Sequence, residues 1–176
     1  MLTEELMAKP SSDILQLLRK HHQILNNSIK TLQNKAAVAV EKQNQLAHFI
    51  QLLEGHSAAE EATLYAVLKD IEESQLQTFE GQEEHAVCKI LIDELGDLNF
   101  KTNWTTEIEA KAIVLSEIVA HHIAEEEDKI FKQAEALLTK EELIIIGEEF
   151  QIQFQQHSNR KKLASRFHQP HRDLQL

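Results

Sequence analysis

The chain contains almost no residues that interrupt a helix: two Pro and four Gly among 176 residues. An all-β sandwich or barrel needs turn residues about every 8 to 12 positions, so this count argues against one. The single cysteine excludes an internal disulfide and a Cys-rich metal site, and it favours a reducing compartment. The composition therefore predicts an all-α, cytoplasmic protein.

Apolar residues recur at helical spacing along most of the sequence. The predicted helices run from the cap candidates at 11–13 to about residue 34, over 46–71, from a capping box at Ser74 to Gly96, from Thr106 to about residue 138, and from a capping box at Thr139 onward. Long helices joined by short connections favour an antiparallel up-down-up-down four-helix bundle, with a short additional C-terminal helix. We expect this domain to span residues 1–156.

Charge is distributed unevenly along the chain. The formal net charge is -11, although five basic residues and one acidic residue follow from Arg160 onward. We expect residues 157–176 to form a basic, weakly ordered tail that is solvated or folds back on the acidic bundle; an acidic partner or nucleic acid is the less favoured alternative. The acidic remainder argues against nucleic-acid binding, and no apolar stretch approaches the ~20 residues that cross a membrane.

One ten-residue pattern occurs twice. Residues 56–65 and 122–131 both read His-x3-Glu-Glu-x2-aliphatic-aromatic. A weaker match relates His22, followed by apolar residues at +3, +7 and +10, to His85, which is followed by Cys and apolar residues at the same steps. The chain therefore resembles a duplicated helical hairpin, with a His and then a His-Glu pair in each copy.

These polar side chains lie on helix faces that are otherwise apolar, so they are predicted to point into the core. Residues four apart share a face, which brings His56 to Glu60 and His122 to Glu126. Buried carboxylates cost several kcal/mol unless something binds them. Imidazole and carboxylate without thiolate favour iron, with manganese or zinc as alternatives. We predict two ions that are bridged by the two Glu and by an oxo or hydroxo group, with two His each and an open position.

The ordered set of motifs over residues of about 11 to 140 resembles the hemerythrin-like (HHE cation-binding) family, a four-helix bundle with a non-haem di-iron centre. The resemblance implies the metal ligands His22, His56, Glu60, His85, His122 and Glu126. Two departures separate the chain from oxygen-carrying hemerythrins: Lys89 stands where they have a further His, and Glu126 stands where they have an Asp one residue later. The four-His, two-Glu set is more similar to the bacterial iron-centre repair proteins.

Some neighbouring residues compete with these assignments. His21 competes with His22, and His121 with Glu125 competes with His122, although the face of His121 is acidic. The residues expected beside the ligands are Glu61 and Glu127 as supporting or surface groups, Tyr65 and Phe131 as core packing, and Cys88 as a buried small side chain.

Three functions remain open at this point. The leading hypothesis is a di-iron protein that binds or senses a small ligand such as dioxygen or nitric oxide at an open metal position. The second is a redox enzyme that acts on peroxide or nitric oxide at the same centre, or a protein that repairs iron centres by donating iron. The third is a metal-free bundle with a structural or partner-binding role.

Overall fold

The computed structural model describes residues 12–167, and every regular element in that range is a helix, which confirms the predicted all-α class. The elements in chain order are α1 (Ile14–Gln33), α2 (Ala39–Ala62), α3 (Leu64–Leu68), α4 (Glu72–Asp97), α5 (Thr106–Glu125), η1 (Glu126–Ile130), α6 (Phe131–Leu137) and α7 (Lys140–Phe167). Among the described residues, no helix combines the length and the apolar character needed to cross a membrane.

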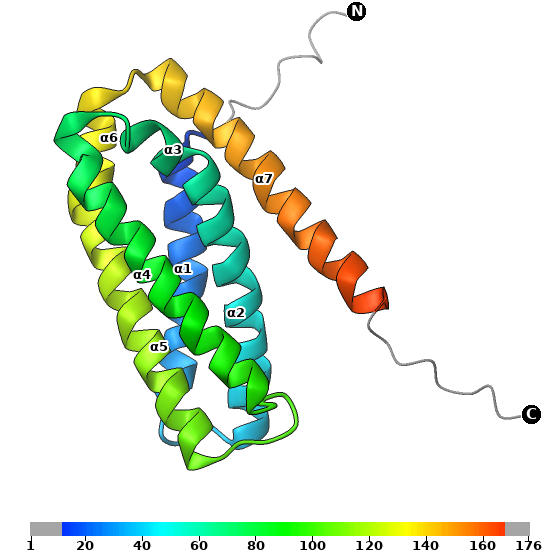
Figure 1. The fold of residues 1–176 in the computed structure, drawn as a ribbon. Helices are drawn as coiled ribbons and strands as arrows, with labels where there is room; N and C mark the ends of the chain where they lie inside the picture. The colour runs from blue at the N-terminus through cyan, green and yellow to red at the C-terminus, as the bar shows by residue number, and fades with distance from the viewer. Residues whose placement is uncertain (1–11, 168–176) are drawn as a thin grey trace, which may run out of the picture.

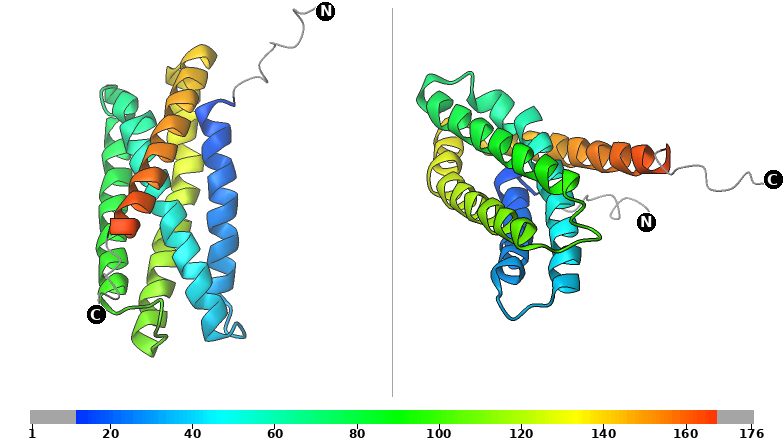
Figure 2. Two further views of the ribbon diagram at one scale, coloured as in Figure 1. Left: turned by 90° about the vertical axis from the view of Figure 1, so that its right-hand side faces the viewer. Right: turned by 60° about the horizontal axis from the view of Figure 1, so that its bottom comes forward.

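Four long helices, α1, α2, α4 and α5, lie side by side (Figure 1). The connections from α1 to α2 and from α4 to α5 lie together at one end, and the short helix α3 lies at the other. α1 packs on both α2 and α5, and α4 packs on α5. The further views show α7 outside this group, along the side that α1 and α2 form (Figure 2).

The helix starts follow local side-chain chemistry, with two differences from expectation. Asp13 caps α1 by accepting a hydrogen bond from the backbone N–H of Gln16 at 2.9 Å, and Thr139 and Glu142 form the predicted capping box before α7. The capping box predicted at Ser74 is wrong, because α4 begins two residues earlier and the Ser74 hydroxyl donates to the carbonyl of Leu68. Thr106 with Glu109 likewise predicts a capping box, but α5 is capped by Thr105, whose hydroxyl accepts a hydrogen bond from the backbone N–H of Ile108 at 3.3 Å.

Two predicted helices are interrupted inside. The helix expected over 46–71 breaks at Thr63, whose backbone leaves the helical region and whose hydroxyl donates to the carbonyl of Ala59 at 2.7 Å. The helix expected from Thr106 onward contains the π-helical turn η1, which begins at Glu126. π-turns are rare and occur frequently at functional sites. Both irregularities lie within four residues of a predicted ligand.

The apolar interior is divided into two clusters. One cluster fills the half of the bundle that includes Leu25, Phe49 and Leu115, and the other fills the half that includes Leu18 and Phe131. Along α1, α2 and α5 the chain passes from one cluster to the other near the predicted ligands, whereas α4 contributes only to the first cluster, beyond His85. A polar layer therefore crosses the middle of the bundle and is enclosed by apolar side chains at both ends.

The C-terminal helix is longer than expected. α7 has 28 residues and continues without a break through residue 157, where we expected the tail to begin; residues 168–176 lie outside the described part of the chain. α7 crosses the start of α1 at Gly147, where a Cβ atom would lie 2.7 Å from the Ser12 carbonyl oxygen. Only glycine permits this approach, which allows α7 to pack on α1 and α2.

Candidate metal centre

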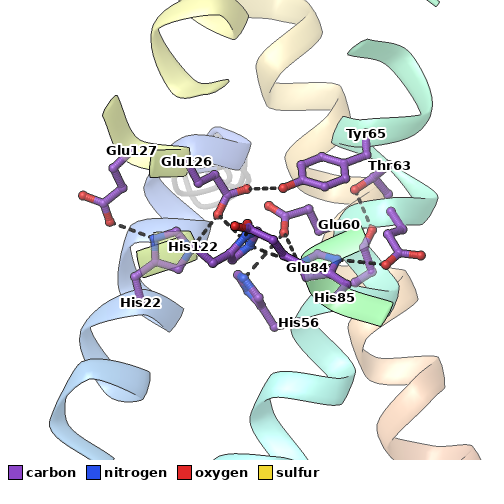
Figure 3. Close-up of polar contacts among 12 residues, drawn as sticks. His22, His56, Glu60, Thr63, Tyr65, Glu84, His85, His122, Glu126 and Glu127 are labelled. Atoms are coloured by element: carbon purple, nitrogen blue, oxygen red, sulfur yellow. Dashed lines mark hydrogen bonds and ion pairs between the residues drawn. The ribbon is translucent and has the colours of Figure 1, made fainter. Parts of the chain in front are cut away.

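The six predicted ligands come from four helices and the π-turn, and all of them are buried. No side chain of the set is more than 6% exposed. Figure 3 shows the side chains converging on one point between the helices. The set consists of His22 from α1, His56 and Glu60 from α2, His85 from α4, His122 from α5 and Glu126 from η1.

The six side chains divide into two groups, each able to hold one ion. His22, His56 and Glu126 offer ligand atoms that lie within 4.8 Å of one another, and so do Glu60, His85 and His122. In the first group, His22 Nε2 lies 3.1 Å from Glu126 Oε2. In the second group, His85 Nε2 lies 3.1 Å from His122 Nε2 and 3.7 Å from Glu60 Oε2.

The carboxylates also reach across between the groups. Glu60 Oε2 lies 3.6 Å from His56 Nε2, and Glu126 Oε2 lies 3.8 Å from His122 Nε2. Each carboxylate therefore has one histidine of each group within 4 Å. This arrangement suits carboxylates that bridge two neighbouring ions.

Three of the four histidines are held from outside by a carboxylate. Glu127 Oε1 lies 2.7 Å from His22 Nδ1, Glu61 Oε1 lies 2.8 Å from His85 Nδ1, and Glu84 Oε2 lies 2.7 Å from His122 Nδ1. These contacts place the proton on Nδ1 and leave Nε2 with a lone pair that faces inward. Such carboxylate–histidine pairs are usual around metal ions, where they fix the ring and raise its basicity.

An aromatic ring lies against one histidine of each group. Phe131 stacks on His22 with ring centroids 5.7 Å apart, and Tyr65 stacks on His85 at 5.6 Å. The Tyr65 hydroxyl also donates a hydrogen bond to Glu126 Oε1 at 3.2 Å. Tyr65 thus joins the polar layer, in addition to the packing role we expected for it.

Several inward-facing atoms have no hydrogen-bond partner among the described residues. Both oxygens of Glu60, both nitrogens of His56, His22 Nε2 and Glu126 Oε2 are buried and unpaired; the last two are close but outside hydrogen-bond geometry. Leaving so many buried polar atoms unsatisfied costs about 1–3 kcal/mol each. Cations between the two groups would satisfy them, so the residues present fit a metal pair.

Burial sets the electrostatics of the same atoms. It raises the pKa of the Glu60 carboxyl well above its usual range, and the nearby Glu126 raises that pKa further. Burial lowers the pKa of His56 well below its usual range, with His22 contributing. Without a cation the charged form of Glu60 is therefore disfavoured. The pKa of Glu126 is instead held well below its usual range, because its contacts with His22 and His122 outweigh the effect of burial.

The two competing histidines lie outside this convergence. His121 is exposed, and its Nε2 lies 3.7 Å from Glu125 Oε2 on the surface of α5. The His21 ring lies 5.6 Å from the His56 ring and contacts Phe154 of α7 at 4.7 Å, but it belongs to neither group. Cys88 is buried and free, as expected.

Two residues of the site were not identified from the sequence in this role, namely Glu84 and Tyr65. The residue equivalent to Glu84 in the other hairpin is His21, so the repeat gave no acidic signal there. Tyr65 occupies the aromatic position of the ten-residue pattern, where the other copy has Phe131. The replacement of Phe by Tyr at this position was the one feature of the sequence that could have indicated a hydroxyl group in the core.

Comparison with known proteins gives one match. Residues 13–134 match the family model of the hemerythrin HHE cation binding domain. Searches of curated proteins and of solved structures gave no match. The matched segment contains all six predicted ligands and ends before α7, and it covers more than half of the sequence. The chain belongs to the hemerythrin HHE cation-binding domain family.

Proposed function

We propose that the protein binds two iron ions between His22, His56, Glu60, His85, His122 and Glu126, and that it binds or senses a small ligand such as dioxygen or nitric oxide there. The observation that carries this proposal is the convergence of six buried nitrogen- and oxygen-bearing side chains from five elements, four of which have inward-facing atoms without a hydrogen-bond partner among the described residues. Manganese and zinc suit the same donors and are the alternatives.

The architecture supports the proposal. The short connections and the packing of α1 on α2 and of α4 on α5 support an antiparallel up-down-up-down bundle, which builds metal sites from facing helices. Two apolar clusters enclose the polar layer, so water is largely excluded from it. In such a low-dielectric site, each contact between a carboxylate and a cation is stronger than it would be in water.

Each group of side chains has a separate role. Three of the histidines direct Nε2 inward, because their Nδ1–H groups donate hydrogen bonds to the carboxylates of Glu127, Glu61 and Glu84. Glu60 and Glu126 supply the negative charge that balances the cations. When bound, iron supplies a Lewis-acidic, redox-active centre for small molecules. The Tyr65 hydroxyl keeps one oxygen of Glu126 in place.

Reconstitution of the metal-free protein tests this function. We expect anaerobic addition of ferrous iron to give about two ions per chain by elemental analysis, and subsequent exposure to air to produce visible charge-transfer bands. The double variant His56→Ala/Glu126→Ala should reduce the iron content to background, whereas the exposed Glu117→Gln on α5 should not. Background iron in the unmodified protein would instead favour a metal-free bundle.

The same preparation separates binding from turnover. A protein that only binds its ligand takes it up once per centre and stops. Sustained consumption of peroxide or nitric oxide with a reductant, abolished in Glu60→Ala, would identify a redox enzyme. Transfer of iron to an iron-depleted cluster protein would identify the repair function.

A further inference from the structure

The duplication of the sequence is reproduced in the contacts of the site. His22 and His85 occupy equivalent positions in the two hairpins, and so do Glu127 and Glu61. Each of these histidines has its Nδ1 within 2.8 Å of the acidic residue from the opposite hairpin. The rings that stack on them, Phe131 and Tyr65, are equivalent as well. The surroundings of His22 and His85 are therefore equivalent in the two halves of the site.

The surroundings of the other pair of equivalent histidines, His56 and His122, differ. His122 Nδ1 has Glu84 Oε2 at 2.7 Å. The residue equivalent to Glu84 is His21, since each directly precedes the first histidine of its hairpin. The His21 ring lies 5.6 Å from the His56 ring, and the Nδ1 atoms of both rings are buried with no hydrogen-bond partner within residues 12–167. An imidazole therefore stands where the other half has a carboxylate.

The helix α7 packs over the His56 half, and farther along the chain its His157 lines the cavity that reaches His85. Phe150 lies edge-on to His56 at 6.2 Å between ring centroids, and Phe154 lies 4.7 Å from His21. Gly55 permits this packing, because a Cβ atom there would lie 2.9 Å from Phe154 Cε2. α7 lies beyond residue 134, where the family match ends. The wall over His56 is thus built by a part of the chain outside the matched domain.

The other half is approached by two pockets. A narrow pocket between α4 and the α5–η1 segment is lined by Glu84, His122 and Glu126. A cavity of about 340 Å³ between α2 and α4 reaches His85 and Glu61. Both pockets therefore lie against the His85 and His122 half, and the larger one is on the side of His85.

His21 cannot supply what Glu84 supplies. An imidazole carries no negative charge in either protonation state, and it offers no pair of acceptor oxygens. His21 therefore cannot raise the basicity of a ligating histidine as an outer carboxylate does. Loss of such an outer carboxylate typically lowers metal affinity by about 10- to 100-fold.

We propose that the two ion positions are unequal: His85 and His122 hold the tighter ion, and His21 acts as a positioning residue that makes binding at His22 and His56 weaker, behind a wall of α7. This inference rests on the proposed metal function. It also places the approach of small ligands at the His85 and His122 half.

Zinc titration of the metal-free protein against a chromophoric chelator tests the inequality. Because the first bound ion repels the second, two binding steps are expected even if both positions have the same intrinsic affinity. The inequality is therefore tested by how each variant changes the two steps. Glu84→Gln removes the outer carboxylate that the other half also lacks, without adding a zinc ligand beside His121, and should weaken the first step by about 10-fold or more while leaving the second unchanged. His21→Glu copies the carboxylate onto the His56 half and should strengthen the second step by about 10-fold.

Controls separate a specific effect from a loss of folding. Glu117→Gln removes an acid at an exposed position of α5 without adding a zinc ligand and should change neither step. Glu84 is partly exposed, so its replacement is tolerated even if His21→Glu disturbs the packing on α7; circular dichroism checks each variant. A first step unchanged by Glu84→Gln overturns the inference and leaves the metal function standing. No zinc binding by the unmodified protein contradicts both.

Diethyl pyrocarbonate labelling of the metal-free protein tests the wall without any metal. The exposed His121 should be modified quickly and His56 slowly, as read by mass spectrometry of peptides. Phe154→Ala should increase the His56 rate about 10-fold or more, whereas Ile152→Ala, at an exposed position of α7, should not. Equal rates for His56 and His121 in the unmodified protein would overturn the screening by α7.

Discussion

The Tyr65 hydroxyl donates a hydrogen bond to Glu126 Oε1 at 3.2 Å, across 61 positions of sequence. Both side chains are buried. Burial, together with the charge of Glu126, raises the pKa of Tyr65 well above its usual range. The phenol therefore remains a donor at any physiological pH. Glu60, the equivalent carboxylate in the other hairpin, has Phe131 in the corresponding place and no such donor.

Tyr65→Phe should weaken both stability and metal binding. The variant keeps the ring stacked on His85 but leaves Glu126 Oε1 without its donor, which costs about 1–3 kcal/mol in a buried site. We expect a lower urea midpoint for the metal-free protein and an affinity for zinc reduced by about 10-fold. Ser116→Ala removes a buried hydroxyl that donates only to the Ala112 carbonyl, and it should leave zinc affinity unchanged. Equal affinities in Tyr65→Phe and the unmodified protein would contradict this role.

Gly81→Ala should displace the same hydroxyl by a different route. A Cβ atom at Gly81 would lie 2.5 Å from the Tyr65 oxygen, which is closer than real Cβ contacts come. Tyr65 must then move away from Glu126, even though alanine favours the helix α4 by about 1 kcal/mol. We expect a net loss of stability in urea unfolding. Gly96→Ala on the same helix meets no atom within 4 Å, so it should be neutral or stabilising.

The sequence predicted the features of the site that depend on spacing within one helix. His56 with Glu60, and His122 with Glu126, face the same point because residues four apart share a face. The repeat added His22 and His85 by alignment. The structure brings these six side chains together in the core.

Contacts between different helices could not be predicted from the spacing of residues within one helix. Glu84 reaches His122 across 38 positions, and Phe150 reaches His56 across 94, so both contacts depend on how α4 and α7 are rotated against their neighbours. The break at Thr63 depends on a hydroxyl that bonds back to the Ala59 carbonyl, a choice the apolar pattern does not encode. The length of α7 was missed because its last turns are polar and basic, which suggested a tail.

Glu127→Gln should weaken metal binding although the side chain is not a predicted ligand. Glu127 Oε1 accepts from His22 Nδ1 at 2.7 Å, and Glu127 Oε2 lies 3.7 Å from the Arg19 guanidinium. Glutamine removes the negative charge behind His22, so we expect zinc affinity to fall by about 10- to 100-fold. Glu135→Gln removes the other acidic partner of Arg19 and serves as the control. A fall in both variants would assign the effect to Arg19 instead.

The thiol of Cys88 should be almost unreactive in the folded protein. Burial raises its pKa to about 12, with the Glu84 charge adding to the effect, and only the thiolate attacks alkylating reagents. We expect iodoacetamide to label the native protein at pH 8 at least about 100-fold more slowly than the urea-unfolded protein. Mass spectrometry over time measures both rates. Rapid labelling of the native form would show that α4 opens locally at this position.

Glu60→Gln should stabilise the metal-free protein, and increasingly so as the pH rises. The pKa of Glu60 is raised in the folded state by burial and by Glu126. A raised pKa contributes stability below the unfolded value of 4.5, and that contribution is lost as the pH rises toward the folded value. The variant has no such loss, so its urea midpoint should be nearly equal to that of the unmodified protein at pH 4.5 and higher at pH 8, by about 2 kcal/mol in unfolding free energy. Saturating zinc should reverse the order at pH 8, because the carboxylate then has a cation to bind. A difference that is the same at both pH values would mean that Glu60 is ionised at no cost in the metal-free core.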